Sequence, residues 1–387
     1  MASTLVSRDG TTFAGTFAVS LSSSHDEAMS LHPASGSSGP QVLTTIAVGH
    51  GPAAAAYDAA DGEMFVANAG TFVGGNVSVI DDTTNQVAKV IQVDETLEGA
   101  AYNSFEGGLY VAAVNHDSVY NIVNTSDAIV ADTPVGSLPL GLAYDSGTNQ
   151  MFVAVSGSDN VSVISCPYDV VVANVSVGSD PSAVTYAGAM HEVFAVNSGS
   201  ANVSVISDAT DKVVATIEVG SEPYGAAYDA ATGEVFVTNY NSGNVTVING
   251  TTDKVSASVR VGSLPWGAAY DARTHAVFVA NSGSDNVSVI SDATNKVVAT
   301  VPVGSDPRAA AYDAAKDEVF VTNYESNTVT VIQGATSPST GLLGLPGTDG
   351  YYLVGGIVAA AAAVIAAILV RRRSRNRPSP APRDPPA

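Results

Sequence analysis

The residues best suited to binding a ligand occupy one recurring place in a repeated stretch, directly after a turn that usually ends in proline. Tyrosine and tryptophan at this place could stack on a ligand, and arginine and glutamate could add charge. The place varies while its neighbours repeat, so it could carry specificity; drift at a solvated rim is the alternative. In chain order it is held by Ala53, Glu98, Leu140, Ser182, Tyr224, Trp266 and Arg308.

Further residues should lie on the same face. Tyr240 and Tyr324 follow another repeated run, and the turns before the variable place contain Asp180, Glu222 and Asp306. Acid-lined loops could bind calcium, although no EF-hand spacing is present. The candidate ligand-binding residues at this rim are Glu98, Tyr224, Trp266, Arg308, Tyr240 and Tyr324.

Signs of catalysis are few. The repeats contain four histidines in different units and at different offsets from a repeated tyrosine, an arrangement that argues against a shared metal site: His50, His116, His191 and His275. No H-E-x-x-H, G-x-S-x-G or P-loop spacing occurs, so hydrolysis and phosphoryl transfer have no visible machinery. We predict no catalytic residue, no metal and no cofactor.

A tyrosine in a stretch resembling P-x-G-A-A-Y-D marks the repeat. The first interval is 45 residues and the following five are 42 each. A fixed period of this length indicates a repeat architecture. The marking residues are Tyr57, Tyr102, Tyr144, Tyr186, Tyr228, Tyr270 and Tyr312.

Each unit contains four short strand-like runs separated by turn residues. In one unit the first run ends at Tyr228, and the other three cover 235–239, 245–248 and 254–261. Runs such as V-F-V-T are apolar or β-branched on both strand faces, as expected for a sheet between two other sheets. The recurring V-G-S-x-P, as at Gly220 and Pro223, is expected to supply a positive φ at glycine and a fixed turn at proline. The sequence predicts an all-β, seven-bladed β-propeller.

The two ends of the repeat region complement each other. Residues 41–48 resemble a fourth strand, whereas the last unit stops after its third strand at Ile332. We therefore expect the N-terminal strand to close the last blade, leaving no open edge, in a propeller covering residues 41–332.

These units resemble the YVTN-type β-propeller repeat proteins, which include prokaryotic surface-layer and secreted seven-bladed propellers. The signature V-F-V-T-N occurs at 235–239 and 319–323, with variants at 64–68, 193–197 and 277–281. Ala113 and Val155 replace its asparagine in two units, so the bonds of that asparagine are not needed in every blade.

Charge divides the chain into an acidic body and a basic tail. The formal net charge is −22, from 37 acidic and 15 basic residues. An acidic body should repel nucleic acid, so a charged partner is expected to be a cation or a basic surface; solubility alone is the alternative reason for the acidity. The lone Cys166 forms no internal disulfide and is expected to be a small buried hydrophobe. The tail arginines are Arg371, Arg372, Arg373, Arg375, Arg377 and Arg383.

A membrane anchor is expected near the C-terminus. Residues 351–370 carry no charge, and twenty helical residues span about 30 Å, the thickness of a bilayer core. Arg371 to Arg373 follow at once, so the positive-inside rule places the propeller outside and 371–387 in the cytoplasm. Residues 333–350 form a Gly/Pro/Ser/Thr-rich linker whose end loosely resembles a sorting signal.

Residues 1–40 contain no clear export signal. They are expected to be a disordered lead-in or the remnant of a signal, unless the weak stretch 11–20 serves or the true start lies upstream.

Asn-x-Ser/Thr sequons fit a glycosylated surface protein. Several share one place in the repeat, so duplication of a turn explains those equally well. The candidates are Asn76, Asn124, Asn160, Asn174, Asn202, Asn244, Asn249 and Asn286.

The leading functional hypothesis is a non-enzymatic surface propeller, anchored in the cell membrane, that serves in adhesion, surface-layer packing or capture of an extracellular protein or glycan. The alternative is an extracellular propeller enzyme of the lactonase or quinoprotein kind. A third reading, a sensor signalling through the helix, would need a partner because the tail is short.

Overall fold

The computed structural model describes residues 39–334, except 72, 73 and 125, and four short strands before them. These are β1 (Thr4–Val6), β2 (Thr12–Ala14), β3 (Phe17–Val19) and β4 (Leu31–Pro33), paired as β1–β2 and β3–β4 in a unit separate from the repeats. Residues 335–350 of the predicted linker, the predicted membrane helix and the tail lie outside the described residues. Among the residues that are described, no helix is long and apolar enough to cross a membrane.

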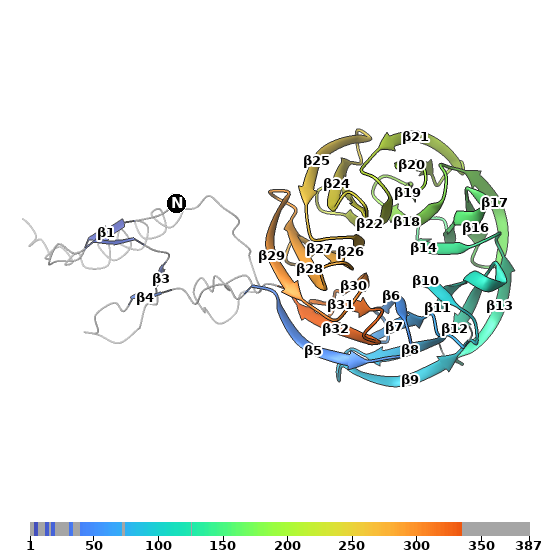
Figure 1. The fold of residues 1–387 in the computed structure, drawn as a ribbon, viewed down its shortest axis with the longest axis horizontal. Helices are drawn as coiled ribbons and strands as arrows, with labels where there is room; N and C mark the ends of the chain where they lie inside the picture. Colours follow the sequence, from blue (N-terminus) through green and yellow to red (C-terminus); the bar gives the residue numbers. More distant parts are fainter. Residues whose placement is uncertain are drawn as a thin grey trace, which may run out of the picture. The chain divides into compact units, whose positions relative to one another are not determined.

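The repeats form seven four-stranded antiparallel sheets, the blades of a propeller (Figure 1). Blade 1 is β6 (Pro52–Asp58), β7 (Glu63–Asn68), β8 (Asn76–Asp81) and β9 (Gln86–Gln92). Blade 2 is β10 (Leu97–Asn103), β11 (Gly108–Ala113), β12 (Ser118–Val123) and β13 (Ala128–Pro134), with the 3-10 turn η1 (Val114–His116). Blade 3 is β14 (Pro139–Asp145), β15 (Gln150–Val155), β16 (Asn160–Ser165) and β17 (Val170–Ser176), with η2 (Ser156–Ser158).

Blades 4 to 7 repeat this order. Blade 4 is β18 (Pro181–Ala187), β19 (Glu192–Asn197), β20 (Asn202–Ser207) and β21 (Lys212–Glu218). Blade 5 is β22 (Pro223–Asp229), β23 (Glu234–Asn239), β24 (Asn244–Asn249) and β25 (Lys254–Arg260). Blade 6 is β26 (Pro265–Asp271), β27 (Ala276–Asn281), β28 (Asn286–Ser291) and β29 (Lys296–Pro302). Blade 7 is β30 (Pro307–Asp313), β31 (Glu318–Asn323), β32 (Thr328–Gln333) and the N-terminal β5 (Gln41–Ala47).

The closure predicted from the sequence is confirmed. β5 pairs antiparallel with β32, with Gln41 opposite Gln333 and Ile46 opposite Val329. Ile46 is buried against the cores of blades 7 and 1. The first strand of the ring therefore completes its last blade, and the edge of β32 is paired as in the other blades.

The core lies between the blades. The second and third strands are buried on both faces, and a phenylalanine recurs at one place in the second strand, as in Phe236 and Phe278. Phe236 packs with Val277 and Val279 of the next blade. In blade 2 the place is taken by Tyr110, whose hydroxyl reaches Asp169 of blade 3 at 2.7 Å. Side-chain packing between successive sheets thus holds the ring together.

The expected positive φ in V-G-S-x-P is displaced by two residues. Gly178, Gly220, Gly262 and Gly304 do not have it, whereas the residue just before the proline does; only Gly136 combines the motif with a positive φ. In these five turns the left-handed residues are Leu138, Asp180, Glu222, Leu264 and Asp306.

Glycine is required in this turn because the recurring asparagine approaches it closely. A Cβ on Gly220 would lie 2.6 Å from Cγ of Asn239. The Gly220 N–H donates to Oδ1 of Asn239 at 3.0 Å, and the Asn239 Nδ2 donates to Asn244 and Thr246. The signature asparagine therefore joins the turn to the second and third strands by hydrogen bonds.

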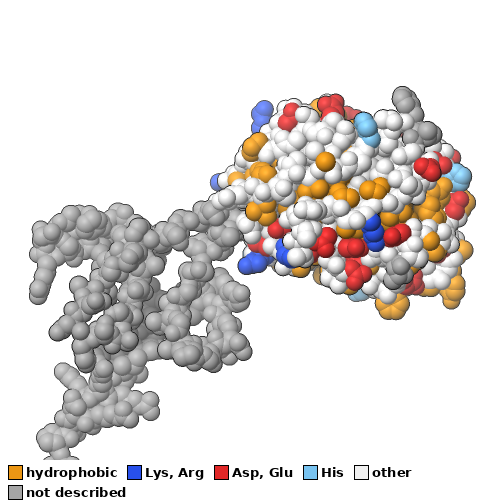
Figure 2. Space-filling model, turned by 90° about the horizontal axis from the view of Figure 1, so that it is seen from below, with side chains coloured by type: hydrophobic (Ala, Val, Ile, Leu, Met, Phe, Trp, Pro, Cys, Tyr) orange, Lys and Arg blue, Asp and Glu red, His pale blue; other side chains and the backbone are white. Residues whose placement is uncertain are grey.

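The fourth strands form the outer wall, where exposed and partly buried side chains alternate along much of each strand. Val172, Val214 and Val298 are more than half exposed, at 52%, 56% and 62%. Figure 2 shows hydrophobic side chains along part of this wall.

Candidate ligand-binding site at the channel mouth

The first strand of each blade stands nearest the central axis (Figure 1). Neighbouring first strands approach closely: a Cβ on Gly225 would lie 2.5 Å from the carbonyl oxygen of Trp266, and one on Gly267 equally close to that of Arg308. Because each strand starts at the same end of the ring, its second residue lies at one mouth of the channel.

Blades 5 and 6 place three aromatic rings together at this mouth. The centroids of Tyr224 and Trp266 are 4.1 Å apart, with the rings tilted by 51°. Tyr240, in the loop after β23, meets Trp266 edge to face at 5.5 Å and Tyr224 at 6.0 Å. Its backbone N–H donates to the carbonyl oxygen of Glu222 at 2.8 Å, which joins the two loops predicted to share a face.

Arg308 extends the cluster into blade 7. Its guanidinium carbon lies 4.5 Å from the ring centroid of Trp266 and 3.3 Å from that of Tyr324. The Nε and Nη2 groups donate to Oδ2 of Asp306 at 3.2 and 3.1 Å. A planar cation held between two aromatic faces and paired with a carboxylate is strongly fixed in orientation.

Glu98 approaches the cluster from blade 2. Blade 1 lies between it and blade 7, and the residue there is the small Ala53. Burial raises the pKa of the Glu98 carboxyl, nearby Arg308 opposes that shift, and Asp306 adds to it. Within the described part of the chain, no group hydrogen bonds to this carboxyl.

The polar tips of the cluster have no partner in the described part of the protein. Among the residues described, the hydroxyls of Tyr224, Tyr240 and Tyr324 and the indole N–H of Trp266 make no hydrogen bond, although these side chains are half-buried. Burial, followed by the charge of Glu98, raises the pKa of Tyr224 to about 12. The cluster combines aromatic faces with unused donors and acceptors, a composition typical of binding surfaces.

The structure thus brings five of the six predicted rim residues into contact and places Glu98 within electrostatic range of Arg308 and Tyr224, but it does not bring in every residue of the variable place. Ser182 is buried, and its Oγ donates to the carbonyl oxygens of Val196 and Pro223 at 3.3 and 3.2 Å. Ala53 is buried as well. The aromatic part of the mouth is therefore confined to blades 5, 6 and 7.

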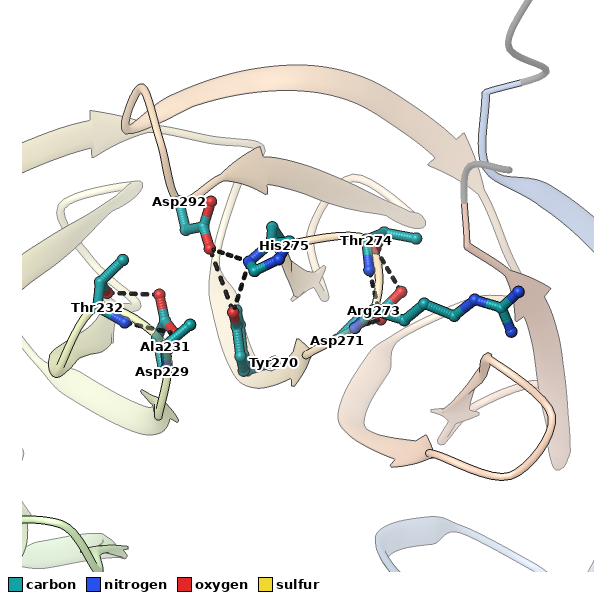
Figure 3. A network of polar contacts seen from close by, with 9 residues as sticks. All are labelled: Asp229, Ala231, Thr232, Tyr270, Asp271, Arg273, Thr274, His275 and Asp292. Atoms are coloured by element: carbon teal, nitrogen blue, oxygen red, sulfur yellow. Dashed lines mark hydrogen bonds and ion pairs between the residues drawn. The ribbon is translucent and has the colours of Figure 1, made fainter. Parts of the chain in front are cut away.

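A second polar network, which the sequence analysis missed, lies at the other end of the first strands (Figure 3). The Tyr270 hydroxyl donates to Asp292 at 3.2 Å and lies 3.3 Å from Nδ1 of His275. Asp229 of the preceding blade lies close enough to help raise the pKa of Tyr270, after burial, which is the largest cause. The marking tyrosine therefore binds an aspartate of its own blade and lies near the buried aspartate of the preceding one.

Aspartate supports the same turn. The Asp271 carboxylate accepts the backbone N–H groups of Arg273 and Thr274 at 2.9 and 3.0 Å, and Asp229 does the same for the turn of blade 5 (Figure 3). These aspartates are fully buried. They cap turns, which is a structural role.

Two of the histidines turn out to be equivalent. His191 and His275 each follow their tyrosine by five residues, and each Nδ1 lies near an aspartate, 3.2 Å from Asp208 and 3.1 Å from Asp292. The equal spacing from tyrosine to histidine was visible in the sequence and could have predicted this equivalence. Across the described residues, no group of three or more His, Cys, Asp or Glu side chains is arranged to hold a metal ion.

Cys166 is buried, as predicted. Its surroundings raise the pKa of the thiol to about 12, with burial the largest cause. The thiol is therefore protonated at neutral pH and poorly reactive.

The sequons differ in accessibility. Asn124 is 8% exposed and its Nδ2 donates to Asp58 and Asp61, whereas Asn174 is exposed on β17. At the repeated place, Oδ1 of Asn202 and Asn286 accepts from the signature asparagine of the preceding strand at 2.8 Å. This pairing accounts for the recurrence of that sequon without glycosylation.

No protein-family model and no curated protein sequence matches the chain. Solved structures do match. Hydrazine synthase of Kuenenia stuttgartiensis aligns with a TM-score of 0.66 and 21% identity, over 74% of this chain and 96% of that one. This likeness shows the fold alone. The chain folds as a seven-bladed β-propeller, an architecture shared by proteins of many functions.

Proposed function

We propose that this chain is a non-enzymatic binding protein of the cell surface, and that the aromatic and arginine cluster at the channel mouth is its ligand-binding site. The observation that carries the proposal is the set of half-buried aromatic side chains whose polar tips have no partner in the described protein. Tryptophan, tyrosine and arginine supply most of the binding energy in protein interfaces, so an extracellular protein, or a glycan, is the partner we favour.

The surface location rests on the sequence. The uncharged stretch 351–370 followed by arginines supports a single membrane span with the propeller outside. The repeated V-F-V-T-N supports membership of the YVTN-type propellers and, with it, a role in adhesion or in a surface layer. Protease treatment of intact cells should degrade an epitope tag placed before residue 39 and spare one placed after residue 387.

The binding site is tested by capture from native membranes with the tagged full-length chain as bait. A Tyr224→Ala/Trp266→Ala double variant should lose a partner that the unmodified chain retains. Tyr168→Ala is the matched control, because Tyr168 is an aromatic residue that is 76% exposed and belongs to the turn between β16 and β17. Equal recovery of every partner by both variants would refute the site.

An enzyme of the lactonase or quinoprotein kind is the second candidate. Glu98 favours it, because a half-buried carboxyl with a raised pKa beside Arg308 could act as a general acid. Lactone turnover by the purified chain that disappears in Glu98→Gln would establish this alternative. An absorption spectrum and a metal analysis of the native protein would reveal a bound quinone or ion.

A further inference from the structure

The mouth of the channel carries more negative charge than its own side chains neutralise. Among the described residues, Arg308 is the basic side chain at this mouth. Two of the N–H donors of Arg308 are already bound to Asp306. Glu98 and Glu222 have no ion-pair partner within the described residues. Both carboxylates help raise the pKa of Tyr224, which places that ring near two negative charges.

The aromatic faces also favour a cation. The Arg308 guanidinium already lies over Trp266 at 4.5 Å and over Tyr324 at 3.3 Å, so these rings hold a positive charge within the protein itself. The Tyr224 ring packs against Trp266. The carboxylates of Glu98 and Glu222 are close enough to Tyr224 to help raise the pKa of its hydroxyl. Aromatic rings beside carboxylates bind ammonium and guanidinium groups through the ring quadrupole and charge.

We propose that the partner presents a basic side chain, lysine or arginine, whose cationic group binds at the mouth between Tyr224, Glu98 and Glu222. This inference rests on the proposed binding function and specifies the chemistry of its ligand. The Glu98 carboxyl, which forms no ion pair within the described residues and has only Arg308 as a nearby positive charge, gains a counter-charge of its own. The formal net charge of −22 draws a basic partner toward the protein over longer distances.

Trp266 is the single tryptophan of the chain, so its fluorescence reports on this mouth alone. The full-length protein in detergent is titrated with tetralysine, tetraarginine and tetraglutamate at low salt. The two basic peptides should change the Trp266 emission saturably, and tetraglutamate should leave it unchanged. A response to tetraglutamate, or none to either basic peptide, would overturn the proposal.

Matched charge variants separate the site from the general acidity of the protein. Glu98→Gln and Glu222→Gln should each weaken tetralysine binding about tenfold, which corresponds to about 1.4 kcal/mol. Glu218→Gln removes the same charge from the exposed end of β21, on the outer wall, and should leave the affinity unchanged. Equal tetralysine affinities in the Glu98 and Glu218 variants would show that the peptide binds to the acidic surface in general, and would contradict the inference.

The outcome for the ligand chemistry is distinguishable from that for the binding function. If Tyr224→Ala/Trp266→Ala loses a membrane partner while tetralysine fails to bind, the function stands and the cationic ligand is wrong. If tetralysine binds through Glu98 but both bait proteins retain all partners, the cationic site stands and the proposed function fails.

Discussion

Arg308 and Trp266 come from neighbouring blades, and the guanidinium carbon of the arginine lies 4.5 Å from the centroid of the tryptophan ring. The same guanidinium covers Tyr324. One side chain therefore orders the aromatic cluster across the boundary between blades 6 and 7.

Arg308→Lys should weaken this cluster while keeping the charge. A compact ammonium cannot spread over two rings or bind Asp306 through two donors. We expect the free energy of unfolding to fall by about 0.5–2 kcal/mol, measured by urea unfolding followed through Trp266 fluorescence. Arg260→Lys, on an exposed position of β25, should change it by less than about 0.5 kcal/mol. Similar values for the two variants would contradict the role of Arg308.

Glu98 should reduce stability at neutral pH. Its folded-state pKa is raised by burial, so the folded chain resists ionisation of this carboxyl more than the unfolded chain does. The folded state therefore loses stability as pH rises through the ordinary glutamate pKa of about 4.3 toward the raised value. Glu98→Gln should melt at a higher temperature than the unmodified chain at pH 7 and at the same temperature below pH 4. A lower melting temperature for this variant at pH 7 would show that the carboxylate stabilises the fold.

The marking tyrosines offer a matched pair. The Tyr270 hydroxyl bonds to Asp292, whereas the buried Tyr228 hydroxyl has no hydrogen-bond partner among the residues that the structure describes. Tyr270→Phe should lower the free energy of unfolding by about 1–3 kcal/mol because a buried carboxylate loses a donor. Tyr228→Phe should be neutral or stabilising. Chemical denaturation of the two variants measures the difference, and equal costs would rule out a contribution of the Tyr270–Asp292 hydrogen bond to stability.

Closure by β5 predicts a large effect of a small deletion. Removing residues 1–48 leaves β32 with an unpaired edge and uncovers the core around Ile46, whereas removing residues 1–38 keeps β5. Ile46→Ala alone should cost about 2–5 kcal/mol. Thermal melts should show the longer deletion strongly destabilised relative to the shorter one. Indistinguishable melts would mean that β5 contributes little to the closed ring.

The sequence predicted the ring and the mouth because both depend on a period that can be read along the chain. Once Tyr57 and its successors fix the register, Tyr224, Trp266 and Arg308 must share a place on adjacent blades. The approach of Asp229 to Tyr270 was not visible, because these residues come from different units. The burial of Ser182 escaped prediction as well, since a small hydroxyl can bond to backbone carbonyls where a larger side chain must point outward.

The pairing of Gln41 with Gln333 also means that the chain enters and leaves the ring at one point. A ring entered and left at neighbouring residues has no required starting blade. Joining these two positions and opening the chain in another turn between a fourth and a first strand would yield a circular permutant with every strand neighbour preserved. The place where β5 meets β32 is thus set by chain order alone, whereas the arrangement of the blades around the mouth is preserved in any such permutant.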